Sequence, residues 1–247
     1  MKRQTDPGEI SPKGEGFVKG LAIDPVIFGF HEAQLKILVV EHGNTGLFAL
    51  PGGYIRENED LDAAAQRVLS ATTGLQNIYL QQFHTFGAVS RNNIATIRTI
   101  MEGQGIDYQP DHWILGRFFS AGYYALVDFT KTVPRPAATA DSCRWYDLNS
   151  LPPLILDHAQ IVAKALKMLQ ANLESTSSDF IQWGAELLPD TFTMADLQRL
   201  YETILNKPLV RTNFQRKMLS SGFLERVDKK RTGAAHKPAF LYRFRKS

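Results

Sequence analysis

The first candidate site in the sequence is a glycine turn followed by charged side chains. Gly52 and Gly53 let backbone N–H groups approach a phosphate closely, and the guanidinium of Arg56 can bind phosphate oxygens through paired hydrogen bonds. Glu59 is a single carboxylate beside Arg67, an arrangement more typical of an orienting ion pair than of a catalyst. The chemistry expected here is the binding of an anionic group without its turnover.

A longer motif surrounds this turn, because the stretch from Gly53 to Leu75 is similar to the Nudix box. Where Nudix hydrolases carry three metal-binding glutamates, this chain has Val68, Ala71 and Thr72, which share one helix face at i, i+3 and i+4. Magnesium requires hard oxygen ligands, so we expect this face to bind no metal and to support no hydrolysis. The positions that match the box, after Leu50-Pro51-Gly52, are Gly53, Glu59, Arg67, Leu69, Gly74 and Leu75.

We therefore predict a ligand-binding site without cofactor, metal or catalytic residue. Its predicted effector-binding residues are Gly52, Gly53, Arg56, Glu59, Arg67, Arg91 and Arg117.

The second candidate site lies near the C-terminus, where positive charge is concentrated. The segment from Lys207 to Ser247 holds twelve Lys and Arg against Glu225 and Asp228, a net charge of +10. The whole chain is only +3, so the residues before this segment sum to −7. Such asymmetry indicates that one end of the protein binds a polyanion.

The elements in this segment have the order of a winged helix-turn-helix. Thr193 is placed to cap a helix from Met194 to Leu205, whose apolar stripe is Leu197, Leu200, Tyr201 and Ile204. Asn206 to Val210 is a turn into a second helix, Arg211 to Ser220, where Thr212 and Gln215 have capping-box spacing.

The second helix and the following hairpin carry the residues expected to bind DNA. Phe214, Met218 and Leu219 form the helix's predicted apolar side, and the opposite side is Asn213, Arg216, Lys217 and Ser220. Strands at 223–227 and 239–244 flank a basic turn at 228–233. In a winged helix the second helix reads base edges and the wing binds phosphates. The predicted DNA-binding residues are Arg211, Thr212, Asn213, Gln215, Arg216, Lys217, Lys229, Lys230, Arg231, His236 and Lys237.

The elements before this segment predict an α+β domain, specifically a Nudix-like α/β/α sandwich. Residue patterns indicate strands at 21–30, 35–40, 47–51, 78–86 and 118–129, and a helix that begins at Leu61 and stops at Gly74. Residues 92–116 interrupt this order with a helical stretch, 92–101, and a loop, so we interpret them as an insertion.

A helix capped by Asp157 and a polar run at 175–178 follow, and they predict the domain boundaries. We expect an effector-binding domain at 1–156, a connecting helix and linker at 157–178, and a winged helix-turn-helix domain at 179–247.

Composition fits a soluble protein of a reducing compartment. The 247 residues are 44% hydrophobic, and Cys143 is the single cysteine, which excludes an intramolecular disulfide. No run approaches the roughly 20 apolar residues of a membrane span, and the first sixteen residues lack the apolar core of a signal peptide. We expect a cytoplasmic protein with no membrane partner.

Taken together, both halves resemble the Nudix-related transcriptional regulators. The supporting strings are Thr85-Phe86-Gly87 with Arg91, Tyr123-Tyr124-Ala125-Leu126-Val127, Leu151-Pro152 with Asp157-His158, Leu187-Leu188-Pro189, Phe192-Thr193, Leu197-Gln198, Tyr201-Glu202, Asn213-Phe214-Gln215-Arg216-Lys217 and Leu241-Tyr242-Arg243-Phe244.

The resemblance implies a homodimer that represses genes of NAD metabolism or pentose use. It also implies release from double-stranded operator DNA when ADP-ribose or a sugar derivative binds. Arg216 and Lys217 match the family's basic pair, whereas Gln215 stands where an arginine is common. Residues 92–116 replace a loop that is usually short, which leaves the effector's identity open.

Two other functions remain open from the sequence. An active Nudix hydrolase of nucleoside diphosphate derivatives with an appended nucleic-acid-binding module would need carboxylates from outside the box, and Glu57, Asp60 and Glu102 are nearest. An interaction module would use the Nudix remnant only to dimerise.

Overall fold

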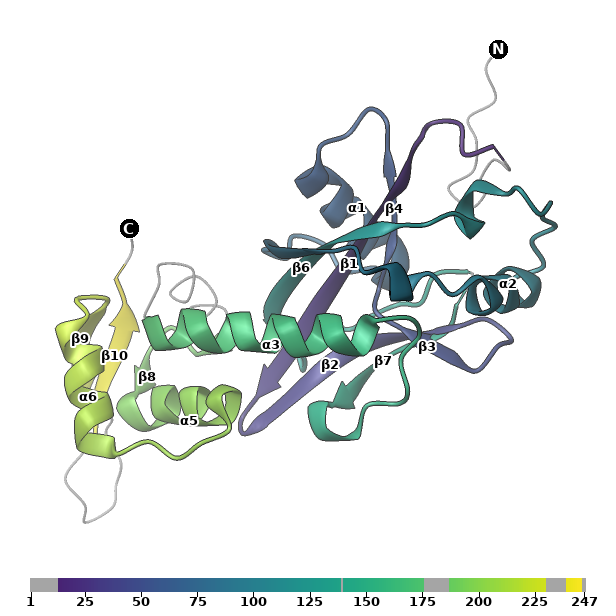
Figure 1. Ribbon diagram of the computed structural model, residues 1–247. Coiled ribbons are helices and arrows are strands. Elements are labelled where there is room, and N and C mark those ends of the chain that lie inside the picture. The colour runs from purple at the N-terminus through teal and green to yellow at the C-terminus, as the bar shows by residue number, and fades with distance from the viewer. Residues whose placement is uncertain (1–12, 139, 176–186, 230–238, 246–247) are drawn as a thin grey trace. The chain divides into compact units, whose positions relative to one another are not determined.

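The protein has the α+β architecture that the sequence predicts, with a large sheet and a separate small one (Figure 1). The computed structural model describes residues 13–138, 140–175, 187–229 and 239–245. Residue contacts divide the chain into two compact units, which are described in turn.

The first unit is built on a seven-stranded sheet. Its order is β3-β2-β1-β6-β5, with β4 paired to β1 and β7 to β2. The strands are β1 (Phe17–His31), β2 (Gln34–His42), β3 (Leu47–Ala49), β4 (Gly53–Arg56), β5 (Gln81–Phe86), β6 (Phe119–Asp128) and β7 (Ala140–Asp147).

Strand β7 was not predicted, and β5 begins at Gln81 rather than at residue 78. Two further differences concern the glycine turn. β4 was not predicted: Gly53 belongs to a strand that pairs antiparallel with β1, opposite Ile23. β1 also begins four residues earlier than predicted, at Phe17, because a register shift between Phe17 and Ala22 continues the pairing. Gly20 lies in that irregular stretch with φ +82°, which favours glycine.

Helix α1 (Leu61–Thr73) packs on the sheet and ends as predicted at Gly74. Gly74 has φ 71°, and its N–H donates to the Ser70 carbonyl, which closes the last turn. Ala65 and Val68 are buried in a cluster with Ile23 of β1. This packing fixes the Nudix-box helix against the strands that carry the glycine turn.

The predicted insertion, residues 92–116, is compactly folded. A 3₁₀ turn, Val89–Arg91, leads into α2 (Ile94–Gly103), slightly later than the predicted 92–101, and a second 3₁₀ turn follows at Trp113–Leu115. Trp113 stacks on Phe17 at 5.6 Å between ring centroids and meets Tyr54 edge-on at 4.7 Å. The insertion is therefore packed on the strands β1 and β4 rather than a loose excursion.

The far end of α2 contacts the turn between β2 and β3. The Gly103 carbonyl accepts from Asn44 Nδ2 at 3.3 Å, and a Cβ at Gly103 would lie 2.7 Å from the Gly43 carbonyl oxygen. Glycine is thus required for this approach.

Helix α3 (His158–Ser175) contributes its first half to this unit and its second half to the other. It begins directly after Asp157, whose carbonyl accepts from the Ile161 N–H. In the part of the chain that the structure describes, no helix is both long and apolar enough to cross a membrane.

The second unit contains the winged helix. Its sheet has the order β8-β10-β9, and the elements are β8 (Phe192–Thr193), α5 (Met194–Leu205), α6 (Arg211–Ser220), β9 (Leu224–Lys229) and β10 (Phe240–Phe244). Thr193 caps α5 in a capping box with Asp196, and the four predicted apolar residues of α5 are buried. The tip of the β1–β2 hairpin and the end of β6 also belong to this unit.

Helix α6 corrects two details of the prediction. It begins at Arg211, but its N-cap is Val210 and no side chain caps it, so Thr212 does not form the predicted capping box. Phe214 and Met218 are buried, whereas Leu219 is 44% exposed and does not belong to the buried side.

Candidate functional site

A cavity of about 260 Å³ opens in the first unit, beside the glycine turn. Of the predicted effector-binding residues, Gly52, Gly53 and Arg91 line it. The insertion supplies much of the wall through Asn92, Asn93, Ile97, Ile100, Met101, Gln104, Ile106, Ile114 and Gly116. The rest comes from the sheet, from Thr72 of α1, from Ala137 and from the residues that precede and begin α3.

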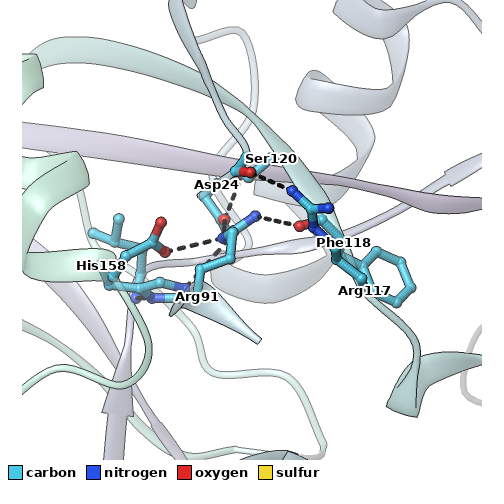
Figure 2. Close-up of polar contacts among 9 residues, drawn as sticks. Asp24, Arg91, Arg117, Phe118, Ser120 and His158 are labelled. Atoms are coloured by element: carbon cyan, nitrogen blue, oxygen red, sulfur yellow. Dashed lines mark hydrogen bonds and ion pairs between the residues drawn. The ribbon is translucent and has the colours of Figure 1, made fainter. Parts of the chain in front are cut away.

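Arg91 is buried at the floor of this cavity, with 6% of its surface exposed, and each nitrogen of its guanidinium donates a hydrogen bond (Figure 2). Nε donates to Asp157 Oδ1 at 3.2 Å, and Nη2 to Asp24 Oδ2 at 3.3 Å. Nη1 donates to the Phe118 carbonyl at 3.3 Å. Two carboxylates therefore neutralise this arginine inside the protein, as a buried charge requires.

Asp24 and His158 extend the cluster. Asp24 Oδ2 also accepts from the Ser120 hydroxyl at 2.5 Å, and Oδ1 lies 3.8 Å from His158 Nε2 (Figure 2). The Leu50 N–H donates to His158 Nδ1 at 3.0 Å, so the neutral ring carries its proton on Nε2, facing Asp24. Burial lowers the pKa of His158, against the opposing effect of Asp24.

His42 brings a second uncharged imidazole to the cavity wall. Burial, aided by the nearby His158, lowers the pKa of His42 to about 4. Its Nδ1 lies 3.3 Å from Gln104 Nε2, a contact between β2 and the insertion. At neutral pH the ring therefore presents hydrogen-bonding atoms but no charge.

The helix face that carries glutamates in Nudix hydrolases has Val68 buried, Thr72 half-buried and Ala71 exposed here. Val68 is buried, and a Cβ added at Gly53 would lie 3.1 Å from a Val68 methyl group, so Val68 fills the space between α1 and β4. The Thr72 hydroxyl lines the cavity and donates to the Val68 carbonyl at 2.8 Å. Within the described ranges, no three His, Cys, Asp or Glu side chains are grouped as a metal site requires.

Glu59 and Arg67 form an ion pair, outside the residues that line the cavity. Arg67 Nε donates to Glu59 Oε2 at 2.8 Å, and its Nη2 contacts Glu59 Oε1 and donates to the Tyr54 carbonyl at 2.7 Å. Glu59 also accepts from the Arg56 N–H at 2.7 Å, and its pKa is lowered mainly by the Arg67 hydrogen bond. The pair holds the loop after β4.

The other two predicted arginines also lie outside the cavity lining. Arg56 is exposed on β4. Arg117 donates to the Gly87 carbonyl at 2.7 Å and lies over the Phe119 ring, 5.0 Å from its centroid.

The predicted DNA-binding face of α6 is exposed at Arg211, Thr212, Asn213 and Arg216, and Gln215 is half-buried. Arg216 Nη2 donates to Asn213 Oδ1 at 3.3 Å, which keeps both side chains on one side of the helix. Lys217 is engaged differently: its Nζ donates to the Glu174 carbonyl in the last turn of α3 at 2.5 Å.

Four of the five predicted wing residues lie outside the described residues, namely Lys230, Arg231, His236 and Lys237. The fifth, Lys229, ends β9 without a described side chain.

Sequence reasoning missed the acidic partners of Arg91 and the histidines of the wall. Asp24 lies 67 residues from Arg91 and Asp157 lies 66 residues away, so no local pattern relates them. The available signal was the placement of charged residues in or beside apolar runs, as with Asp24 in the run from Leu21 to Phe30.

Two family models match the chain. Residues 20–169 match the NUDIX domain, and residues 184–244 match the NrtR DNA-binding winged helix domain.

Individual proteins are also similar to this chain over most of its length. The chain is 29% identical over 231 residues to the ADPR responsive transcriptional repressor NtrR of Acinetobacter baylyi, covering 91% of this chain and 81% of that protein. The crystal structure of Shewanella oneidensis NrtR aligns with a TM-score of 0.64 and 27% identity over 92% of this chain and 94% of that one. The same protein complexed with a 27mer DNA aligns with the same TM-score over 91% of this chain and 93% of that one, at 27% identity.

A hydrolase also matches part of the chain. The ADP-ribose pyrophosphatase of Methanocaldococcus jannaschii is 26% identical over 145 residues, which cover 58% of this chain and 70% of that protein.

The depressed pKa of His42 predicts a loss of stability in mild acid. In the unfolded chain a histidine binds a proton near pH 6.5, whereas folded His42 does so near pH 4. Between these values the unfolded state holds more protons, so the free energy of unfolding falls as pH decreases through this window, by about 3 kcal/mol in total. Urea unfolding of wild type and His42→Gln from pH 7 to pH 4 measures this term.

The variant should lose that part of the pH dependence, and His84→Gln, at an exposed position, is the control that should keep it. Identical pH profiles for His42→Gln and wild type would contradict the assignment.

Proposed function

Because the chain belongs to the NUDIX domain family and its residues 184–244 match the NrtR DNA-binding winged helix domain, we propose that it is a ligand-responsive transcriptional repressor. The observation that carries this proposal is α6, a helix in the second position of a helix-turn-helix whose Arg211, Asn213 and Arg216 are exposed together. A helix of this kind enters the major groove of operator DNA. The relatives described as a repressor and as a DNA complex support the same function.

The effector is proposed to bind in the cavity of the Nudix unit. The Acinetobacter relative is described as responsive to ADPR, so ADP-ribose or a close derivative is the first ligand to test. The protein binds this ligand without hydrolysing it, because Val68, Ala71 and Thr72 occupy the positions of the metal-binding glutamates. The protein then needs no cofactor.

Helix α3 is proposed to couple effector binding to DNA binding. Asp157 and His158, at its beginning, belong to the Arg91 cluster at the cavity floor. Glu174, in its last turn, accepts hydrogen bonds from Lys207 and from Lys217 of α6. A ligand that shifts the first group changes the support of the recognition helix through one continuous helix.

The proposed organisation keeps the effector domain at 1–156, the connecting helix and linker at 157–178 and the DNA-binding domain at 179–247. Two copies of this protein act as a homodimer in the cytoplasm, because paired half-sites match the two-fold symmetry of a dimer.

The second candidate function is hydrolysis of nucleoside diphosphate derivatives, which the match to an ADP-ribose pyrophosphatase favours. Its carboxylates would have to come from Glu57, Asp60 or Glu102, which are not among the residues that line the cavity.

Contact of Arg216 with base edges predicts that its replacement reduces the sequence specificity of DNA binding. On an operator selected from random duplexes, Arg216→Ala should cost about 1 to 3 kcal/mol and lower the specific-to-random affinity ratio. Lys230→Ala is the comparison, because a phosphate contact in the wing should weaken all sequences alike and reduce the salt slope by about one. An unchanged specificity ratio for Arg216→Ala would exclude α6 as the reading helix.

Absence of the metal-binding glutamates predicts absence of turnover. With ADP-ribose or NAD and either Mg²⁺ or Mn²⁺, the purified protein should release no AMP or phosphate in an assay sensitive to far below about one turnover per second. An active ADP-ribose pyrophosphatase run in parallel is the positive control. Turnover at an ordinary enzymatic rate would favour the second candidate function.

Control of DNA binding by the effector predicts reciprocal affinities. If ADP-ribose weakens operator affinity tenfold, the operator complex must bind ADP-ribose tenfold more weakly than the free protein, a coupling of about 1.4 kcal/mol. Isothermal titration with and without operator measures both affinities. Equal ADP-ribose affinities in the two states would mean that this ligand does not control repression.

A further inference from the structure

The cavity floor is poorly suited to a phosphate group. Arg91 is the only Arg or Lys among the described residues that line the cavity, and all three of its nitrogens already donate within the protein. Its partners Asp24 and Asp157 outnumber it, so the cluster has a formal charge of −1 with a neutral His158. A phosphate placed against this floor would meet excess negative charge in a region shielded from water.

The imidazoles do not change this balance. Burial lowers the pKa values of His42 and His158, so neither ring supplies a cation at neutral pH. Arg56 and Arg67, two of the predicted effector-binding residues, are outside the lining, and Arg67 is paired with Glu59.

Apart from Asn92, Asn93 and Gln104, the side chains of the insertion that line the cavity are apolar. Ile97, Ile100 and Met101 of α2 face the cavity, and Met101 packs in a cluster with Trp113 and Tyr54. A surface of this kind buries a flat ring favourably, whereas each hydroxyl of a sugar laid against it would need a hydrogen-bond partner that aliphatic side chains lack.

The cavity floor nevertheless offers a ligand one hydrogen-bond acceptor, the Asp24 carboxylate. Asp24 lines the cavity, and its Oδ1 has the His158 ring 3.8 Å away, beyond hydrogen-bond distance. A carboxylate oxygen accepts hydrogen bonds, so it suits an amino or hydroxyl group of an uncharged ligand.

We propose that the cavity takes the uncharged base-and-ribose end of its ligand, with the base against the insertion wall, and that the ligand's phosphates stay outside. This inference rests on the proposed function, because it concerns the effector of that same site. It makes residues 92–116 the segment that determines ligand specificity.

The test compares three ligands on the full-length protein by isothermal titration at pH 7.5. Adenosine has the base and ribose without charge, ribose 5-phosphate has the charge without the base, and ADP-ribose has both. We expect adenosine to bind within about tenfold of ADP-ribose, and ribose 5-phosphate to bind about a hundredfold more weakly than ADP-ribose. Adenosine binding should change little between low and high salt, because no ion pair forms.

Two substitutions in α2 test whether the base of the ligand binds against the insertion wall. Ile97→Asn alters the cavity wall, and Ile94→Asn makes the same change on the same helix at a residue that is 40% exposed and outside the lining. Ile97→Asn should weaken adenosine and ADP-ribose by a similar factor of about ten or more, and Ile94→Asn by about twofold or less. Thermal unfolding checks that each variant is folded, and Ile106→Asn replaces Ile97→Asn if the latter is not.

The outcomes separate this inference from the proposed function. If ADP-ribose binds and releases the operator but adenosine does not bind, the inference is overturned and the proposed function stands. Ribose 5-phosphate binding as tightly as ADP-ribose, or equal effects of the two isoleucine variants, also overturns it. If none of the three ligands binds while operator binding is intact, both this inference and the proposed effector are wrong, and repression itself is unaffected.

Discussion

The neutralisation of one buried guanidinium is the interaction on which the first unit depends. Arg91 is 6% exposed, and an unpaired charge at that depth would be unfavourable by several kcal/mol. Its partners come from β1, from the residue before β6 and from the residue before α3, so satisfying one side chain fixes three separate segments at one point. The His158 contact to the Leu50 N–H adds the chain that enters the glycine turn.

The pairing of Arg91 within the protein limits how the cavity of the Nudix unit can bind a ligand. Each nitrogen of the Arg91 guanidinium already donates within the protein, and two carboxylates neutralise its charge. The Val68 side chain fills the space between α1 and β4. What remains is a cavity with a largely apolar lining and a few polar groups, a combination typical of small-molecule binding sites.

Local features of the fold were predictable because local interactions determine them. Thr193 as a helix cap, the buried stripe of α5 and the stop at Gly74 follow from side-chain chemistry within one or two turns, and the structure confirms them. Strand β4 was missed because its four residues resemble a turn in sequence. Thr212 was assigned to a capping box, whereas Val210 occupies the N-cap position of α6 and no side chain caps the helix. Helical spacing also placed Leu219 with the buried residues, but burial depends on the packed neighbours.

The candidate site was less predictable, because its members converge from distant segments. Asp24 lies in the middle of an apolar strand and looked like an interruption until Arg91 and Ser120 were seen to contact it. The insertion could be recognised because its helical stretch and loop interrupt the order of strands, but its role as a cavity wall depends on the packing of Trp113 against Phe17.

Two adjacent cations of α6, Arg216 and Lys217, make different contacts. Arg216 is exposed and held by Asn213, whereas Lys217 reaches the carbonyl of Glu174 at the end of α3. Carbonyls in the last turn of a helix lack intrahelical partners and carry partial negative charge, so they favour a lysine. The contact is exposed, and contacts of this kind contribute little to stability. A phosphate that approached α6 could therefore draw Lys217 away from Glu174, and any movement of α3 would alter the same competition.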